Sequence, residues 1–145
     1  MSDNIYKIAR ETAGVTASRW SEMLGVSTEA VRLYERGEIT PADDIVLSMA
    51  DISGLQILGT WHLRRKSAVA AEVLPPVERL PLAQAVVQLL ARIRDFNARH
   101  TADELLTIAE DGRVAPEEEE RFKQIVRDLQ PLISACMQID YAERG

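Results

Sequence analysis

Residue types that mark several protein classes are scarce in this chain of 145 residues. Its one cysteine, Cys136, excludes an intramolecular disulfide and favours a reducing compartment. No apolar run approaches the roughly 18–20 residues of a membrane-spanning helix, and no charged-then-apolar signal segment opens the sequence. We therefore expect a cytoplasmic protein with no membrane partner.

Signatures of metal binding and catalysis are missing as well. His62 and His100 have no partners at metal-ligand spacing. A calcium loop with Gly112 at its sixth position would place Thr107 and Ala109 where acidic ligands are required. No glycine-rich phosphate loop and no nucleophile motif occurs in the sequence. We expect no enzymatic activity, no metal site and no cofactor.

The composition that remains favours helices. Glycine (7 residues), proline (6) and aromatic residues (5%) are few, whereas the strong helix formers Ala, Leu, Glu, Arg and Gln are common. Apolar residues make up 46% of the chain, which is enough to form a core. The sequence therefore predicts an all-α fold.

Charge is distributed unevenly along the chain. The net charge is −6, but residues 1–66 carry eight Lys and Arg against nine Asp and Glu, and residues 67–145 carry nine against fourteen. Most of the acidity thus belongs to the second part. A nearly neutral first part is compatible with an anionic partner, although the electrostatic contribution to affinity would be modest.

Apolar spacings and capping signals predict five helices in the first 66 residues. Gly14 is expected to end the first helix, and Thr16 and Ser27 to cap the second and third. Trp20 and Met23 should point inward from the second helix. The approximate helical ranges are 5–13, 17–24, 28–35, 42–52 and 55–66.

A proline-containing segment follows the fifth helix, whose basic end at residues 64–66 complements the helix dipole. Pro75, Pro76 and Pro81 interrupt helical continuity, although residues 68–73 could form a short helical turn. We therefore predict three parts: a bundle over residues 1–66, a linker over residues 67–81 and a helical region over residues 82–145.

A long apolar stripe opens the C-terminal region. Spacings of 4, 3, 4, 3 and 4 residues are typical of a helix that packs lengthwise on another helix. The stripe comprises Leu82, Val86, Leu89, Ile93, Phe96 and His100. This helix runs to Glu110, or breaks at Thr101, which forms a capping-box pattern with Glu104.

The last helix is expected to open at Pro116 with acidic residues 117–120, and Pro131 should kink or divide it. Two such helices rarely bury enough surface for independent stability, so we expect a homodimer through the C-terminal helices. Cys136 is expected to be a small core residue. The apolar stripe of the last helix is Phe122, Ile125, Val126, Leu129, Ile133, Cys136 and Met137.

The stretch Thr16–Gly37, TASRWSEMLGVSTEAVRLYERG, is the most informative part of the sequence. It predicts two amphipathic helices joined by a tight turn, LGVS, which is the layout of a helix-turn-helix. Together with IARETAGVT, which precedes it, this stretch resembles the phage Cro/repressor type of helix-turn-helix, the XRE family, over Ile5–Gly54. The resemblance implies a five-helix lambda-repressor-like DNA-binding bundle, followed here by a C-terminal helical hairpin.

The resemblance also implies which residues contact DNA. Arg32 can pair with guanine and Glu29 with cytosine, and Arg36 suits a phosphate. Thr28 can bond to a base or contact a thymine methyl, and the backbone at residues 16–18 can donate N–H groups to a phosphate. The implied set is Thr16, Ala17, Ser18, Ser27, Thr28, Glu29, Arg32 and Arg36.

Two further positions bear on the resemblance. Many family members carry Gln where this chain has Ala17, and an alanine cannot make that polar contact. The family often pairs an arginine of the first helix with a glutamate at the end of the third, which here implies an ion pair between Arg10 and Glu35.

The function implied is sequence-specific binding of double-stranded DNA by a transcriptional regulator, a phage- or prophage-type repressor that acts as a dimer on an inverted-repeat operator. Two alternatives stay open. One is a protein-interaction adaptor or antitoxin whose acidic C-terminal half binds a partner protein. The other is a regulator whose C-terminal half senses a small ligand between its helices.

Overall fold

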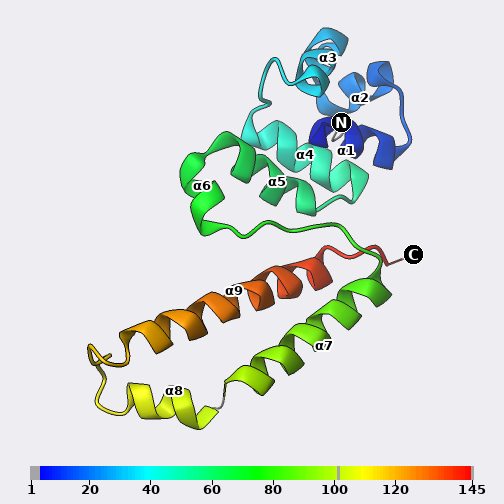
Figure 1. The fold of residues 1–145 in the computed structure, drawn as a ribbon. Coiled ribbons are helices and arrows are strands. Elements are labelled where there is room, and N and C mark those ends of the chain that lie inside the picture. Colours follow the sequence, from blue (N-terminus) through cyan, green and yellow to red (C-terminus); the bar gives the residue numbers. More distant parts are fainter. Residues whose placement is uncertain (1–3, 101, 145) are drawn as a thin grey trace. The chain divides into compact units, whose positions relative to one another are not determined.

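The computed structural model describes residues 4–100 and 102–144, and every regular element among them is a helix (Figure 1). The chain divides into two compact units, Met1–Leu74 and Pro75–Gly145. The division falls inside the predicted linker, because residues 68–73 form a helix that packs on the one before it. No helix of the described residues is long and apolar enough to cross a membrane.

The first unit contains the five helices predicted for it and one more. Asn4 caps the first helix through its side chain, Thr16 caps the second and Ser27 the third, so the two predicted hydroxyl caps are confirmed. Gly14 ends the first helix in the left-handed conformation, as predicted. The helices are α1 (Ile5–Ala13), α2 (Ala17–Leu24), α3 (Thr28–Arg36), α4 (Asp43–Ser53), α5 (Ile57–Lys66) and α6 (Ala68–Val73).

Large apolar side chains fill the centre of this unit, where α1 packs against α3, α4 and α5. Trp20, Met49 and Leu58 are completely or almost completely buried. Burying a side chain of this size stabilises a fold by about 1.5–3 kcal/mol. Met23 was predicted to point inward but is exposed, whereas Trp20, Ser21 and Leu24 form the buried face of this short helix.

The basic end of α5 forms specific contacts in addition to its place at the negative end of the helix dipole. The Arg64 guanidinium donates to the backbone carbonyls of Ala71 and Leu74, which fixes α6 against α5. Lys66 donates to Asp43 over 2.6 Å and lowers the pKa of that carboxyl group, with a smaller contribution from His62. Two of the three basic residues are therefore engaged within the unit.

His62 is buried between α1 and α4 and forms hydrogen bonds at both ring nitrogens. Its Nδ1 lies 2.9 Å from the Tyr6 hydroxyl, and its Nε2 lies 2.9 Å from Asp43 Oδ1. Burial raises the pKa of Tyr6 above its ordinary value. The histidine is thus a satisfied core residue rather than a metal ligand.

The second unit is a hairpin of two long helices with a short helix at its turn. α7 (Leu82–Arg99) and α9 (Glu119–Asp140) lie side by side and antiparallel, and α8 (Ala102–Ala109) precedes the loop into α9 (Figure 1). α7 ends at Arg99, so the chain breaks where the capping box was predicted, although Thr101 itself lies outside the described residues. α9 runs through Pro131 without division.

The start of α9 differs from the prediction. The helix begins at Glu119 rather than at Pro116, because residues 116–118 form a turn. The Glu118 carboxylate accepts from the backbone N–H of Ala115, and the Glu118 N–H donates to the Ala115 carbonyl. This reciprocal pair satisfies the backbone groups before the first helical turn.

Small side chains form the centre of the hairpin. Ala85 of α7 and Ala135 of α9 are buried, and Ile125 is completely buried farther along α9. Near the open end, Ala85 joins Leu80 and Ala142 in a cluster. There the backbone of Glu143 donates to Leu80 and accepts from Leu82, which ties the residues after α9 to those before α7.

The predicted stripes are only partly buried in this hairpin: Ile125 and His100 are buried, but other members are exposed. Leu82, Val86 and Ile93 on α7 have 42%, 39% and 41% of their surface exposed, and Ile133 on α9 has 51% exposed. Cys136 is also exposed, so its prediction as a core residue was wrong. On α7 the stripe is misaligned with the helix–helix contact, because the buried Ala85 lies beside it, roughly 60° round the helix.

A polar network lies where α7, α8 and α9 meet. The buried His100 Nε2 lies 2.8 Å from Asp128 Oδ2, and Arg121 approaches His100 Nδ1 at 3.1 Å. Arg121 also binds Glu104 and the Arg99 carbonyl. The hydrogen bond from His100 lowers the pKa of Asp128. His100, predicted as the end of an apolar stripe, therefore belongs to an ionic cluster.

This network should make stability depend on pH in acid. A carboxyl group whose pKa is lower in the folded than in the unfolded state stabilises the protein at pH values above its unfolded-state pKa, about 3.9. This stabilisation is lost as the pH falls through the folded-state pKa. We expect Asp128→Asn to be less stable than wild type at pH 6, with the difference shrinking towards pH 2. Thermal unfolding at several pH values measures it, and a difference that stays constant would contradict the assignment.

Candidate nucleic-acid interface

Helices α2 and α3 pack against each other across a tight turn. The turn begins at Gly25, which has φ of +68°, a conformation that residues with a Cβ adopt at a cost. The Gly25 and Val26 backbone N–H groups return to α2 at Glu22 and Ser21. The Ser27 hydroxyl then accepts from the Ala30 N–H and starts α3. Local hydrogen bonds thus fix the direction of α3 relative to α2.

An ion pair braces α3 against α1, as the sequence resemblance implied. Arg10 Nε lies 2.5 Å from Glu35 Oε1 and Nη2 lies 3.0 Å from Oε2, so the contact is bidentate. Arg10 also donates to the Val15 carbonyl over 3.0 Å. Both side chains are more than four-fifths buried, and the hydrogen bond to Glu35 raises the pKa of Arg10. The prediction of this pair is confirmed.

Three predicted contact residues have hydroxyl groups that are already engaged. Thr16 and Ser27 accept from backbone N–H groups as helix caps. The Thr28 hydroxyl lies 3.1 Å from Ser21 Oγ, which in turn donates to the Ser18 carbonyl. A polar contact from Thr28 to a base would therefore compete with the α2–α3 connection.

The outward face of α3 carries charged side chains of both signs. Glu29, Arg32 and Arg36 are exposed and fall within about 60° of one another round the helix. Glu29 lies 3.8 Å from Arg32 and 3.5 Å from Arg36, and Arg36 also donates to Glu38 over 2.5 Å. The bond to Glu38 raises the pKa of Arg36. Arg32 has the longest ion-pair contact of these residues and is the most available cation.

The first residues of α2 belong to the same helix-turn-helix motif and include further predicted contact positions. Ser18 is exposed and Ala17 is partly buried, so the position at which the family often has Gln presents only a methyl group. Arg19 was not singled out from the sequence. It is largely exposed and pairs with Glu22 over 2.9 Å, within the same turn of α2. The backbone N–H of Arg19 donates to the cap residue Thr16, so its exposed guanidinium adds a cation at the N-terminal end of α2.

These ion pairs can be exchanged for other partners. Exposed pairs contribute about 0–1 kcal/mol, because water and salt screen them. A phosphate or base that approached α3 would therefore displace Glu29 or Glu38 from the arginines at small cost. The described residues hold no group of His, Cys, Asp and Glu suited to a metal ion. The site is thus one for polar and electrostatic contacts.

Comparison with known proteins gives no match for this chain among family models, curated proteins or solved structures.

Proposed function

We propose that the protein is a sequence-specific DNA-binding transcriptional regulator, a phage- or prophage-type repressor, and that α1–α5 form a lambda-repressor-like bundle. The observation that carries the proposal is the exposed charged face of α3, which holds Glu29, Arg32 and Arg36. This helix is held by a tight turn and by the bidentate pair of Arg10 and Glu35. A regulator of transcription would act in the cytoplasm, where the DNA lies.

In this proposal α3 enters the major groove. Arg32 reads a guanine, because its guanidinium can donate two hydrogen bonds to O6 and N7. Arg36 and Arg19 bind phosphates on either side, and Glu29 either accepts from a cytosine or repels the backbone at unfavourable positions. Backbone N–H groups at the start of α2 supply a further phosphate contact.

The proposal includes a homodimer through the second unit. A groove on one side of the hairpin is lined by Gln88 and Arg92 of α7 and by Pro131 and Ser134 of α9. The exposed apolar residues follow at 3.6-residue spacing on the other side of the helix–helix contact. They are Leu82, Val86, Leu90 and Ile93 on α7, with Val126 and Ile133 on α9.

A second copy of this chain is the partner that fits this apolar side. The buried residues of the hairpin include Ala85, Ala135 and Ala142, whereas several larger apolar side chains of α7 and α9 are exposed. Two hairpins packed on these sides would form a four-helix arrangement with the larger residues inside, which is a common way to build such a core. A twofold dimer would present two α3 helices about 34 Å apart, matching an inverted repeat.

Selection of bound DNA from a random pool tests the proposal. We expect an enriched inverted repeat whose two halves are centred one helical turn apart. Enrichment of no sequence, together with recovery of a stoichiometric complex with a different protein, would instead support the adaptor or antitoxin function.

Arg32→Ala should weaken binding to the selected operator by about 1–3 kcal/mol, the range for a bidentate contact to a base. Discrimination at the contacted base pair should fall as well, because the lost hydrogen bonds are the ones that read it. Gel-shift titration at fixed salt measures both effects. Arg94→Ala, an exposed arginine on α7, is the control. Equal operator affinity for Arg32→Ala and wild type would contradict the role of Arg32.

A further inference from the structure

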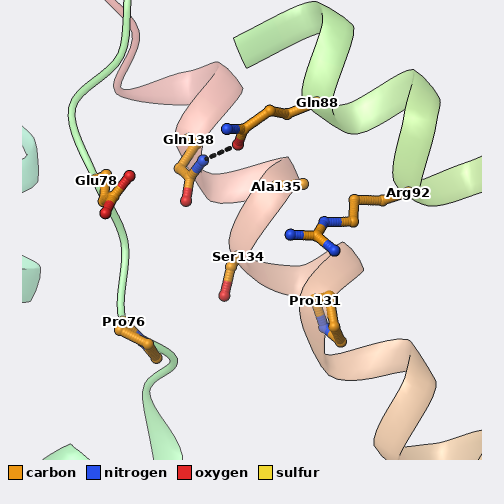
Figure 2. Close-up of a pocket in the computed structure, with 8 residues that line it drawn as sticks. All are labelled: Pro76, Glu78, Gln88, Arg92, Pro131, Ser134, Ala135 and Gln138. Carbon is orange, nitrogen blue, oxygen red and sulfur yellow. Dashed lines mark hydrogen bonds between the residues drawn. The ribbon is translucent and has the colours of Figure 1, made fainter. Parts of the chain in front are cut away.

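A groove on the second unit carries unpaired charges of opposite sign. Its volume is about 330 Å³, at the lower end of the range for small-molecule sites. Residues from the segment before α7, from α7 and from α9 line it (Figure 2). It lies wholly within the second unit, on the side of the hairpin opposite the exposed apolar residues.

Arg92 and Glu78 supply the charges. The Arg92 side chain extends from α7 towards α9, and Glu78 lies on the other side of the groove on the segment that precedes α7 (Figure 2). Within residues 4–100 and 102–144, neither side chain forms an ion pair. By contrast, the neighbouring Arg79 pairs with Glu143 over 3.3 Å.

Polar groups of fixed orientation complete the lining. Gln138 Nε2 donates to Gln88 Oε1 over 3.1 Å, which leaves Gln88 Nε2 as a donor and Gln138 Oε1 as an acceptor. Gln138 is buried, and Ser134 adds a hydroxyl one turn away on α9. Pro131 has no N–H, so the helical hydrogen bond to the carbonyl of Arg127 is missing at this point of α9.

We propose that this groove binds a small zwitterion of the α-amino acid class. The carboxylate of the ligand accepts a bidentate pair of hydrogen bonds from Arg92, a geometry that guanidinium and carboxylate groups favour. Its ammonium group donates to Glu78 and to Gln138 Oε1. A ligand with only one of these charges would leave the other protein charge without a partner.

The position of Glu78 gives such binding a structural consequence. Glu78 belongs to the segment of the second unit that precedes α7, and residues just beyond it are already tied to Glu143. A ligand held between Glu78 and Arg92 would add a second attachment between this segment and the hairpin.

Titration of the full-length protein with each of the twenty protein L-α-amino acids tests the proposal. We expect at least one to raise the temperature of unfolding of the protein saturably, because a ligand that binds only the folded state stabilises it. The N-acetyl and C-amide derivatives of that amino acid should bind at least tenfold more weakly. If none of the twenty gives a saturable increase, or if a derivative binds as tightly as its parent, the proposal is wrong.

Variants tie binding to the groove. Arg92→Gln and Glu78→Gln should each raise the Kd at least tenfold, and both should remain folded because these side chains are exposed and make no ion pair with described residues. Arg94→Gln is the matched control, since this arginine lies on α7 outside the groove with 80% of its side chain exposed. Unchanged affinity in Arg92→Gln would overturn the assignment. No DNA is used, so the result is independent of the proposed DNA binding.

Discussion

Replacing both Val86 and Ile93 with aspartate is expected to convert a dimer into a monomer and to reduce operator affinity at least about a hundredfold. Both residues lie on the exposed apolar side of α7. Charges there would be desolvated in a dimer interface without partners, which is costly. A monomer would bind only one half-site of the operator. It would lose the high effective concentration that the dimer gives to the α3 helix of its second copy.

Light scattering at micromolar concentration and operator titration measure the two effects on the same samples. Leu47→Asp is the control, because Leu47 is an apolar residue of α4 with 64% of its surface exposed and lies in the first unit. It should change neither mass nor affinity. A wild-type mass equal to one chain at this concentration would refute the dimer, as would a double variant that still dimerises.

Loss of the Arg10 guanidinium should produce the largest change in the stability of the first unit among substitutions near α3. Arg10→Ala removes two hydrogen bonds to Glu35 and one to the Val15 carbonyl. Because Glu35 is largely buried, its carboxylate would then lack a partner. We expect a loss of about 2–4 kcal/mol in the free energy of unfolding, in the range for bonds to charged groups and for broken buried pairs.

Urea unfolding measures this loss, and Arg19→Ala provides the comparison. Arg19 makes an ion pair of the same kind with Glu22, but both side chains are 64% exposed. Exposed pairs contribute little, so Arg19→Ala should lie within about 0.5 kcal/mol of wild type. Equal stabilities of the Arg10 and Arg19 variants would mean that the pair with Glu35 does not brace α3.

The helices of the first unit could be predicted because their signals are local. Gly14, Thr16 and Ser27 act within a few residues of their own position, and each was predicted as the cap that it forms. The burial of Val46 and Met49 follows from spacing along a single helix. The prediction for Met23 failed because burial on so short a helix depends on which neighbours reach it.

The second unit was harder to predict because its apolar stripes are only partly buried within the hairpin. The spacing of Leu82, Val86 and Ile93 indicates a buried face, but it does not distinguish a helix of the same chain from one of another. The hairpin uses Ala85 and Ala135 for its internal contact, and small residues give a weak apolar signal. Pro131 likewise indicates a break, yet α9 loses one hydrogen bond there and continues.

The sequence predicted which positions of the candidate interface face outward. It did not predict which of their side chains are free of other hydrogen bonds and so available to bind DNA. The exposed location of Glu29, Arg32 and Arg36 follows from the helical period. That the Thr28 hydroxyl faces Ser21, and that Glu38 binds Arg36, depends on side-chain geometry across a turn. Sequence spacing carries no information on such rotamers, so Arg32 emerged as the most available cation only from the structure.

The bonds between Glu143 and the residues around Pro81 have a consequence for the order of events during synthesis. They join positions that are roughly sixty residues apart. Closing a loop of that length costs conformational entropy, and these few bonds offset only part of that cost. A ribosome adds about 5–20 residues per second. For several seconds the helices around Trp20 and Leu58 are therefore complete while Leu80 and Leu82 still lack their partner, and these bonds form only once residue 143 has been made.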